Sequence, residues 1–201
     1  FPSLFWLILE TSTINSNKLP YYGPKVPREN QDTLFYTLND TLRDLNGNPS
    51  VIDKKQFPVY AITFLKEAYR VDAYRLTGLW EYLNYKKSKV EHIPFLVVSA
   101  ADKGVSATRE ELEKLAVHKN VHFYHWPAES YEQLIKKVFK EKPYYIDYSF
   151  FVLVDANRNI RGYYDGRYVS EIKRLIGEYQ HLRLKEEKRK IIKDNEIKSE
   201  N

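Results

Sequence analysis

Three histidines lie close together in the second half of the chain, at positions 118, 122 and 125. Imidazole is a common ligand of zinc and Cu(II), so the spacing of His118, His122 and His125 raises the question of a metal site. Residues 121–126 are typical of a short strand, in which successive side chains point to opposite faces. His122 and His125 are therefore expected on opposite faces, and the three imidazoles converge only if a bulge interrupts the strand. A weak surface site for Cu(II) is the alternative.

Thiol and thioether chemistry is excluded by composition. The 201 residues contain no cysteine and no methionine. Disulfides, thiolate zinc sites, iron–sulfur clusters, thiol nucleophiles and methionine ligands of copper are therefore ruled out. The sequence also lacks a serine-nucleophile motif, an HExxH metalloprotease motif and a glycine-rich phosphate loop. It predicts neither an enzyme nor a bound cofactor.

The charge balance does not favour nucleic acid as a partner. Lysine and arginine number 32 against 27 acidic residues, which leaves a net charge of +5. A nucleic-acid-binding protein usually concentrates its basic residues on one face. Here the longest basic cluster, residues 185–193, is interrupted by Glu186 and Glu187. Such a cluster is typical of a solvated helix end, and weak contact with anionic lipid or an acidic partner is the alternative.

The length fits one domain with end segments. Residues 1–10 are mostly apolar but too few to span a bilayer. We interpret them as the end of an N-terminal signal anchor, with further residues expected upstream because the first residue is not methionine. The alternative is an apolar strand or helix packed on the domain. Residues 11–32 are predicted to form a tether, residues 33–184 the folded domain, and residues 185–201 a charged tail.

Three continuous apolar runs predict buried strands at residues 58–65, 93–99 and 150–155. Asn46-Gly47 is a hairpin turn signal between two short strands that precede them. Apolar spacing predicts helices at residues 67–85, 108–118, 129–139 and 169–182, the last fraying from Arg183 onward. This order of elements is typical of an α/β protein with a thioredoxin-like fold: a central mixed sheet flanked by helices, with an extra N-terminal β-hairpin.

A block of three segments near the C-terminus carries a specific pattern, and two earlier segments add weaker support. The block comprises residues 146–149 (IDYS), 150–155 (FFVLVD) and 159–166 (NIRGYYDG), and the weaker segments are 19–24 (LPYYGP) and 45–48 (LNGN). Through these segments, residues 19–184 resemble the Sco/SenC family.

This resemblance implies a location and a role. Sco/SenC proteins are membrane-anchored, extracytoplasmic thioredoxin-fold proteins that bind copper and help to assemble the CuA centre of cytochrome c oxidase, and some act as thiol reductants. The resemblance therefore implies a protein on the periplasmic side of the cytoplasmic membrane, anchored at its N-terminus. The implied partner is a protein, such as a respiratory oxidase subunit.

The family's copper ligands are missing from this sequence. Family members carry a Cys-x-x-x-Cys segment after the central strand and a histidine in an Asp-His-Ser segment. A gapless match places Ala68 and Asp72 on the two cysteine positions and Tyr148 on the histidine position. We expect these three residues at one end of the sheet, with no metal between them. Asp72 would favour the helix dipole, and Asp147 and Asp165 would accept hydrogen bonds from loop amides.

The residues and the resemblance together predict a non-catalytic, partner-binding factor related to cytochrome c oxidase assembly. The alternative is a copper metallochaperone that uses a ligand set other than that of the family. The two hypotheses differ in whether the chain binds copper at all.

Overall fold

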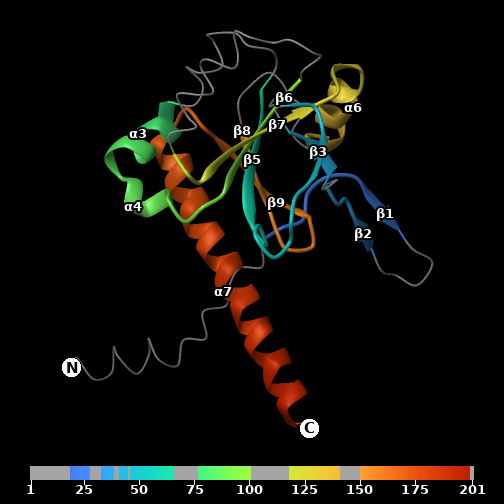
Figure 1. Ribbon diagram of the computed structural model, residues 1–201, viewed down its shortest axis with the longest axis vertical. Coiled ribbons are helices and arrows are strands. Elements are labelled where there is room, and N and C mark those ends of the chain that lie inside the picture. Colours follow the sequence, from blue (N-terminus) through green and yellow to red (C-terminus); the bar gives the residue numbers. More distant parts are fainter. Residues whose placement is uncertain are drawn as a thin grey trace.

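The computed structural model describes residues 19–27, 33–38, 41–44, 46–65, 77–100, 118–140 and 150–199. A mixed seven-stranded sheet crosses the middle of the molecule (Figure 1). Its strands are β3 (Thr41–Arg43), β4 (Pro49–Val51), β5 (Tyr60–Leu65), β6 (Phe95–Ala100), β7 (Val121–Trp126), β8 (Phe150–Val154) and β9 (Ile160–Asp165). The strand order is β4-β3-β7-β6-β5-β8-β9. A separate two-stranded sheet pairs β1 (Lys25–Pro27) with β2 (Thr33–Phe35).

The three predicted buried strands are neighbours at the centre of this sheet. β5 pairs in parallel with β6, and Thr63 lies opposite Val97. β5 pairs antiparallel with β8, where Thr63 lies opposite Phe151. All three of these residues are almost completely buried. Strands buried on both faces are expected to be continuously apolar, which explains why these runs could be recognised in the sequence.

The predicted hairpin at Asn46-Gly47 is also confirmed. β3 and β4 pair antiparallel on either side of this turn. Gly47 has a φ of 84°, a conformation that a residue with a Cβ rarely adopts. The Asp44 carboxylate accepts hydrogen bonds from the backbone amides of Asn46 and Asn48, at 2.9 and 2.8 Å. These bonds lower the pKa of Asp44. The hairpin joins the main sheet where β3 meets β7.

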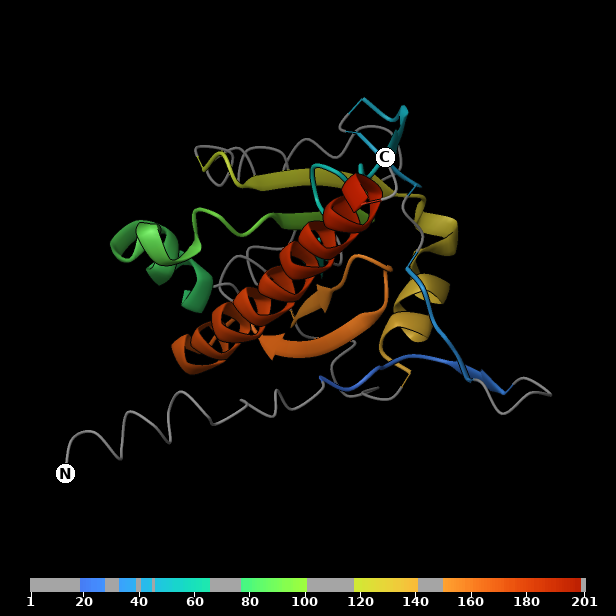
Figure 2. The same cartoon turned by 90° about the horizontal axis from the view of Figure 1, so that it is seen from below.

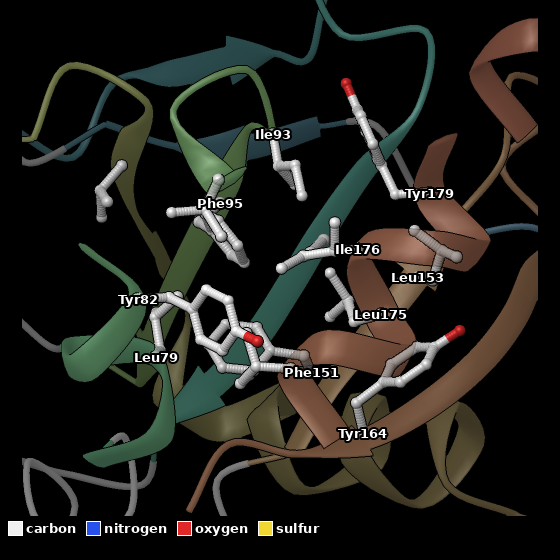
Figure 3. Close-up of a cluster of buried hydrophobic side chains, with 14 of the residues drawn as sticks. Leu79, Tyr82, Ile93, Phe95, Phe151, Leu153, Tyr164, Leu175, Ile176 and Tyr179 are labelled. Atoms are coloured by element: carbon white, nitrogen blue, oxygen red, sulfur yellow. The ribbon is translucent and has the colours of Figure 1, made fainter. Parts of the chain in front are cut away.

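Helices cover both faces of the sheet (Figures 1 and 2). α3 (Thr77–Tyr85), α4 (Lys87–Val90) and α7 (Val169–Ser199) lie on one side, and α6 (Ala128–Val138) lies on the other. Each side has its own apolar cluster. Figure 3 shows the cluster under α3 and α7, where side chains of these helices meet Phe95 and Phe151 of the sheet. The second cluster packs α6 residues such as Leu134 and Ile135 against the opposite face.

The expectation that the last helix frays from Arg183 is wrong. α7 continues to Ser199 and projects beyond the sheet (Figure 1). Its first half is held by burial of residues such as Ile172 and Leu175. Its second half is largely exposed, and ion pairs within the helix stabilise it: Arg183 with Glu187 and Arg189 with Glu186, at 3.3 and 2.8 Å. Local charge pairing thus extends a helix past the end of its apolar stripe.

Several predicted elements lie partly or wholly outside the described residues. The predicted helix at residues 108–118 lies outside them except for its last residue. Of the predicted helix at residues 67–85, only the part that forms α3 is described. Among the described helices, none is both long enough and apolar enough to cross a membrane.

Candidate functional site

The positions that match the copper ligands of the Sco/SenC family follow β5 and precede β8 in the sequence. Ala68, Asp72 and Tyr148 lie outside the described residues, as does Asp147. The strand ends that flank them are described. Because β5 and β8 are antiparallel neighbours, the carboxyl end of β5 and the amino end of β8 lie at the same edge of the sheet.

Polar groups occur at this edge among otherwise apolar strands. Ser99, near the end of β6, is buried, and its Oγ lies 2.9 Å from Nδ1 of His125, near the end of β7. Thr63 on β5 is fully buried, and its hydroxyl has no hydrogen-bond partner among the described residues. Neither Ser99 nor Thr63 was a candidate site residue on the basis of the sequence. The sequence feature that could have identified them is a hydroxyl side chain inside, or at the end of, a run of buried apolar residues.

The histidines do not converge. His122 packs edge-on against Phe57, with ring centroids 4.8 Å apart, and Phe57 belongs to the cluster under α6. His125 contacts Ser99 on the opposite face, so the expected alternation along this strand is confirmed. His118 precedes the strand, and its backbone carbonyl accepts a bond from Val121. In the part of the chain that the structure describes, no group of three histidine or acidic side chains could hold a metal ion.

Burial lowers the pKa of His122 below its ordinary value. The unfolded chain therefore takes up a proton at a higher pH than the folded chain, so acid favours unfolding. We expect the free energy of unfolding to fall as the pH drops below about 6.5, the pKa of an unperturbed histidine. His118 and His125, whose pKa values burial also lowers, add to the same trend. Urea unfolding of the wild type and of His122→Phe between pH 7 and pH 5 tests this; the variant should show a shallower decline, and parallel curves would contradict it.

Asp165 has the role expected for it. Its carboxylate is mostly buried and accepts the backbone amide of Arg167 at 3.0 Å. The Arg167 guanidinium binds the same carboxylate, with Nε 2.9 Å from Oδ1. Asp165 therefore closes the turn between β9 and α7, and its oxygens are occupied by loop and side-chain donors.

A second buried carboxylate organises the N-terminal end of the described chain. Arg161 on β9 forms an ion pair with Asp155 at 2.8 Å, and both side chains are buried. The same guanidinium donates from Nε to the carbonyl of Pro20 at 3.1 Å and from Nη2 to the carbonyl of Leu19. It also lies 4.0 Å from the centre of the Tyr21 ring. We call this set of contacts the Arg161 clamp.

The Arg161 clamp holds a segment that the sequence analysis assigned to the tether. Residues 19–22 lie against β9, and the Tyr22 amide donates to the Ile160 carbonyl at 3.0 Å. The Tyr22 ring packs edge-on against Tyr163, with centroids 5.0 Å apart. Residues 19–22 of the predicted tether are thus packed on the domain.

Comparisons with known proteins identify the fold. No family model matches the chain, and no curated protein matches it in sequence. Solved structures do match. A SCO1/SenC family lipoprotein from Bacillus anthracis str. Ames superposes with a TM-score of 0.55 at 14% identity, covering 83% of this chain and 97% of that one. A putative protein disulfide isomerase from Bacteroides thetaiotaomicron gives 0.51 at 11% identity, covering 73% and 86%.

Yeast Sco1 with copper bound also aligns, with a TM-score of 0.49 at 20% identity over 80% of this chain and 95% of that one. The superposition on the Bacillus anthracis protein confirms the predicted thioredoxin-like fold, with its mixed sheet and flanking helices. The similarity to Sco/SenC proteins seen in the sequence extends to the fold. At these identities the similarity carries the fold alone.

Proposed function

We propose that this chain is a Sco/SenC-like protein that is tethered at its N-terminus on the outer side of the cytoplasmic membrane. It acts there by binding a protein partner during cytochrome c oxidase assembly, without copper or thiol chemistry of its own. The observation that carries the proposal is a Sco/SenC-like fold in a chain of 201 residues without cysteine. The lipoprotein character of the Bacillus anthracis neighbour supports the membrane tether.

The donor set explains why copper transfer is not proposed. Cu(I) is a soft ion that thiolate and thioether ligands select. The sequence offers neither, and the matched positions hold Ala68, Asp72 and Tyr148. An alanine has no donor, and a carboxylate with a phenol is a poor ligand pair for Cu(I). Because the sequence has the fold without these copper donors, the role that we assign to the chain is the binding of a protein partner.

The full chain is expected to retain no Cu(I) against a strong chelator such as bathocuproine disulfonate. Installing the family's ligands through Ala68→Cys, Asp72→Cys and Tyr148→His together should restore tight binding of about one Cu(I) per chain, because two thiolates and an imidazole suit this ion. Metal analysis after gel filtration measures both. Uptake of one Cu(I) per chain by the unmodified protein would overturn the proposal in favour of a metallochaperone with other ligands.

The assembly role needs a separate test in the organism that carries the gene. Deleting the gene should lower cytochrome c oxidase activity in membranes, and the unmodified gene should restore it without added copper. A chain that begins at residue 19 and is exported by a cleavable signal should restore it less well, because it lacks the predicted membrane anchor. Normal oxidase activity in the deletion strain would show that the chain does not serve oxidase assembly.

A further inference from the structure

Three polar side chains form a row across β3, β7 and β6. Arg43 lies directly opposite His125, which lies directly opposite Ser99. Directly opposed residues on neighbouring strands present their side chains on the same face, about 5 Å apart. The neighbouring Leu42 belongs to the cluster under α6, so Arg43 faces the other side, as His125 does. The next position in this row is Leu65, the last residue of β5.

The row has hydrogen-bonding capacity that no described residue uses. Within the described residues, the Arg43 guanidinium makes one hydrogen bond, from Nη1 to the Gly47 carbonyl at 3.1 Å. A guanidinium has five N–H groups, so most of them face no described acceptor. The Ser99 hydroxyl makes a hydrogen bond with Nδ1 of His125, and Nε2 of the ring has no hydrogen-bond partner among the described residues. Arg43 is exposed and His125 is half-buried, so a ligand can reach them.

We propose that Arg43, His125 and Ser99 form a binding site for an oxyanion of the carboxylate or phosphate class. Guanidinium N–H groups match the geometry of two anion oxygens and give strong, charge-assisted hydrogen bonds. In the tautomer in which the Ser99 hydroxyl donates to Nδ1, Nε2 carries the ring proton, and the imidazole then supplies a further N–H donor from the next strand. Ser99 holds the ring through Nδ1 and thereby orients it.

Among the described residues, the acidic group that acts on this row is Asp44, and its charge would oppose an anion. Asp44 acts electrostatically on His125. Its oxygens, however, already accept the amides of Asn46 and Asn48 and the Asn48 side chain. These donors offset part of its charge within the hairpin turn. The site therefore keeps a net attraction for an anion through Arg43. Anion binding here is independent of the proposed role in oxidase assembly.

The test is a titration of the full chain, labelled in its histidine rings, followed by NMR. The sequence has five histidines, and His125→Gln assigns the signal of interest. Sodium phosphate and sodium acetate are added at pH 7 against sodium chloride of the same ionic strength. We expect a saturable shift of the His125 ring signals with a dissociation constant of about 1–10 mM, the range of a few charge-assisted bonds. The ratio of the two affinities identifies the preferred anion, inorganic phosphate or a carboxylate.

Arg43→Gln should weaken the binding at least about tenfold, because it removes the charge and the paired donors. Arg183→Gln on α7 removes the same charge from a half-buried side chain that pairs with Glu187, and it should leave the affinity within about twofold, since salt screens a charge that does not contact the anion. The proposal is overturned if neither anion gives a saturable shift, or if Arg43→Gln binds as the wild type does. An equal loss in Arg183→Gln would also overturn it, because the effect would then follow net charge.

Discussion

Replacing Arg161 with alanine is expected to lower the free energy of unfolding by about 4 kcal/mol, the loss typical of breaking a buried ion pair from one side. The substitution leaves the Asp155 carboxylate buried without its cation. It also removes the donors to the carbonyls of Leu19 and Pro20. Urea unfolding followed by circular dichroism measures the loss.

The Arg161 clamp predicts a local effect beyond the global one. Residues 19–22 should detach from β9 in Arg161→Ala, because the guanidinium binds two carbonyls and the Tyr21 ring in this segment. Brief chymotrypsin treatment under native conditions should then cleave after Tyr21 or Tyr22 well before the rest of the domain. Adding Asp155→Asn to Arg161→Ala should recover part of the stability, because it removes the uncompensated buried charge.

Arg189→Ala is the matched control. Arg189 forms an ion pair with Glu186 at 2.8 Å on the surface of α7, and 54% of its side-chain surface is exposed. Pairs of this kind contribute about 0–1 kcal/mol. Equal losses in the two variants, or unchanged resistance of residues 19–22 to chymotrypsin in Arg161→Ala, would show that the Arg161 clamp does not hold the segment.

The central strands and the hairpin could be predicted because their signals are local. A run such as residues 58–65 is apolar apart from Thr63 since both faces of β5 are buried. Gly47 marks a position of its turn that has a positive φ. The end of α7 could not be predicted from its apolar stripe, because pairs such as Arg183 with Glu187 extend the helix without burial. Burial patterns therefore locate the core better than they locate the ends of exposed helices.

The polar contacts could not be predicted, because they join residues far apart in the sequence. Arg161 binds the carbonyl of Leu19 across 142 positions, and a backbone carbonyl leaves no mark in residue type. Ser99 meets His125 only because β6 and β7 are neighbours in a particular register. The histidine spacing raised the question of a metal site and strand alternation argued against it, but only the strand order shows that His125 lies opposite a serine and an arginine. Strand order and register thus decide the chemistry of this edge.

Gly162→Ala is expected to lower the free energy of unfolding by about 3 kcal/mol, as overpacking a tightly filled site does. A Cβ at position 162 would overlap the hydroxyl of Tyr164 and lie 2.7 and 2.9 Å from its Cζ and Cε2 atoms. The Tyr164 ring cannot move aside easily. It is fully buried beside α7 (Figure 3), its hydroxyl donates to Glu178, and the Arg174 guanidinium lies 4.3 Å from its centre.

Alanine at Gly177, in contrast, should raise the free energy of unfolding. Gly177 lies within α7, and a Cβ there would meet nothing within 4 Å. Alanine in an exposed helix position is favoured over glycine by roughly 0.5–1 kcal/mol, so Gly177→Ala should stabilise the chain.

Adding Tyr164→Phe to Gly162→Ala should recover part of the loss, because it removes the atom that the new Cβ would overlap. If Gly162→Ala were as stable as Gly177→Ala, close packing of Tyr164 over β9 could not be the reason that position 162 is glycine.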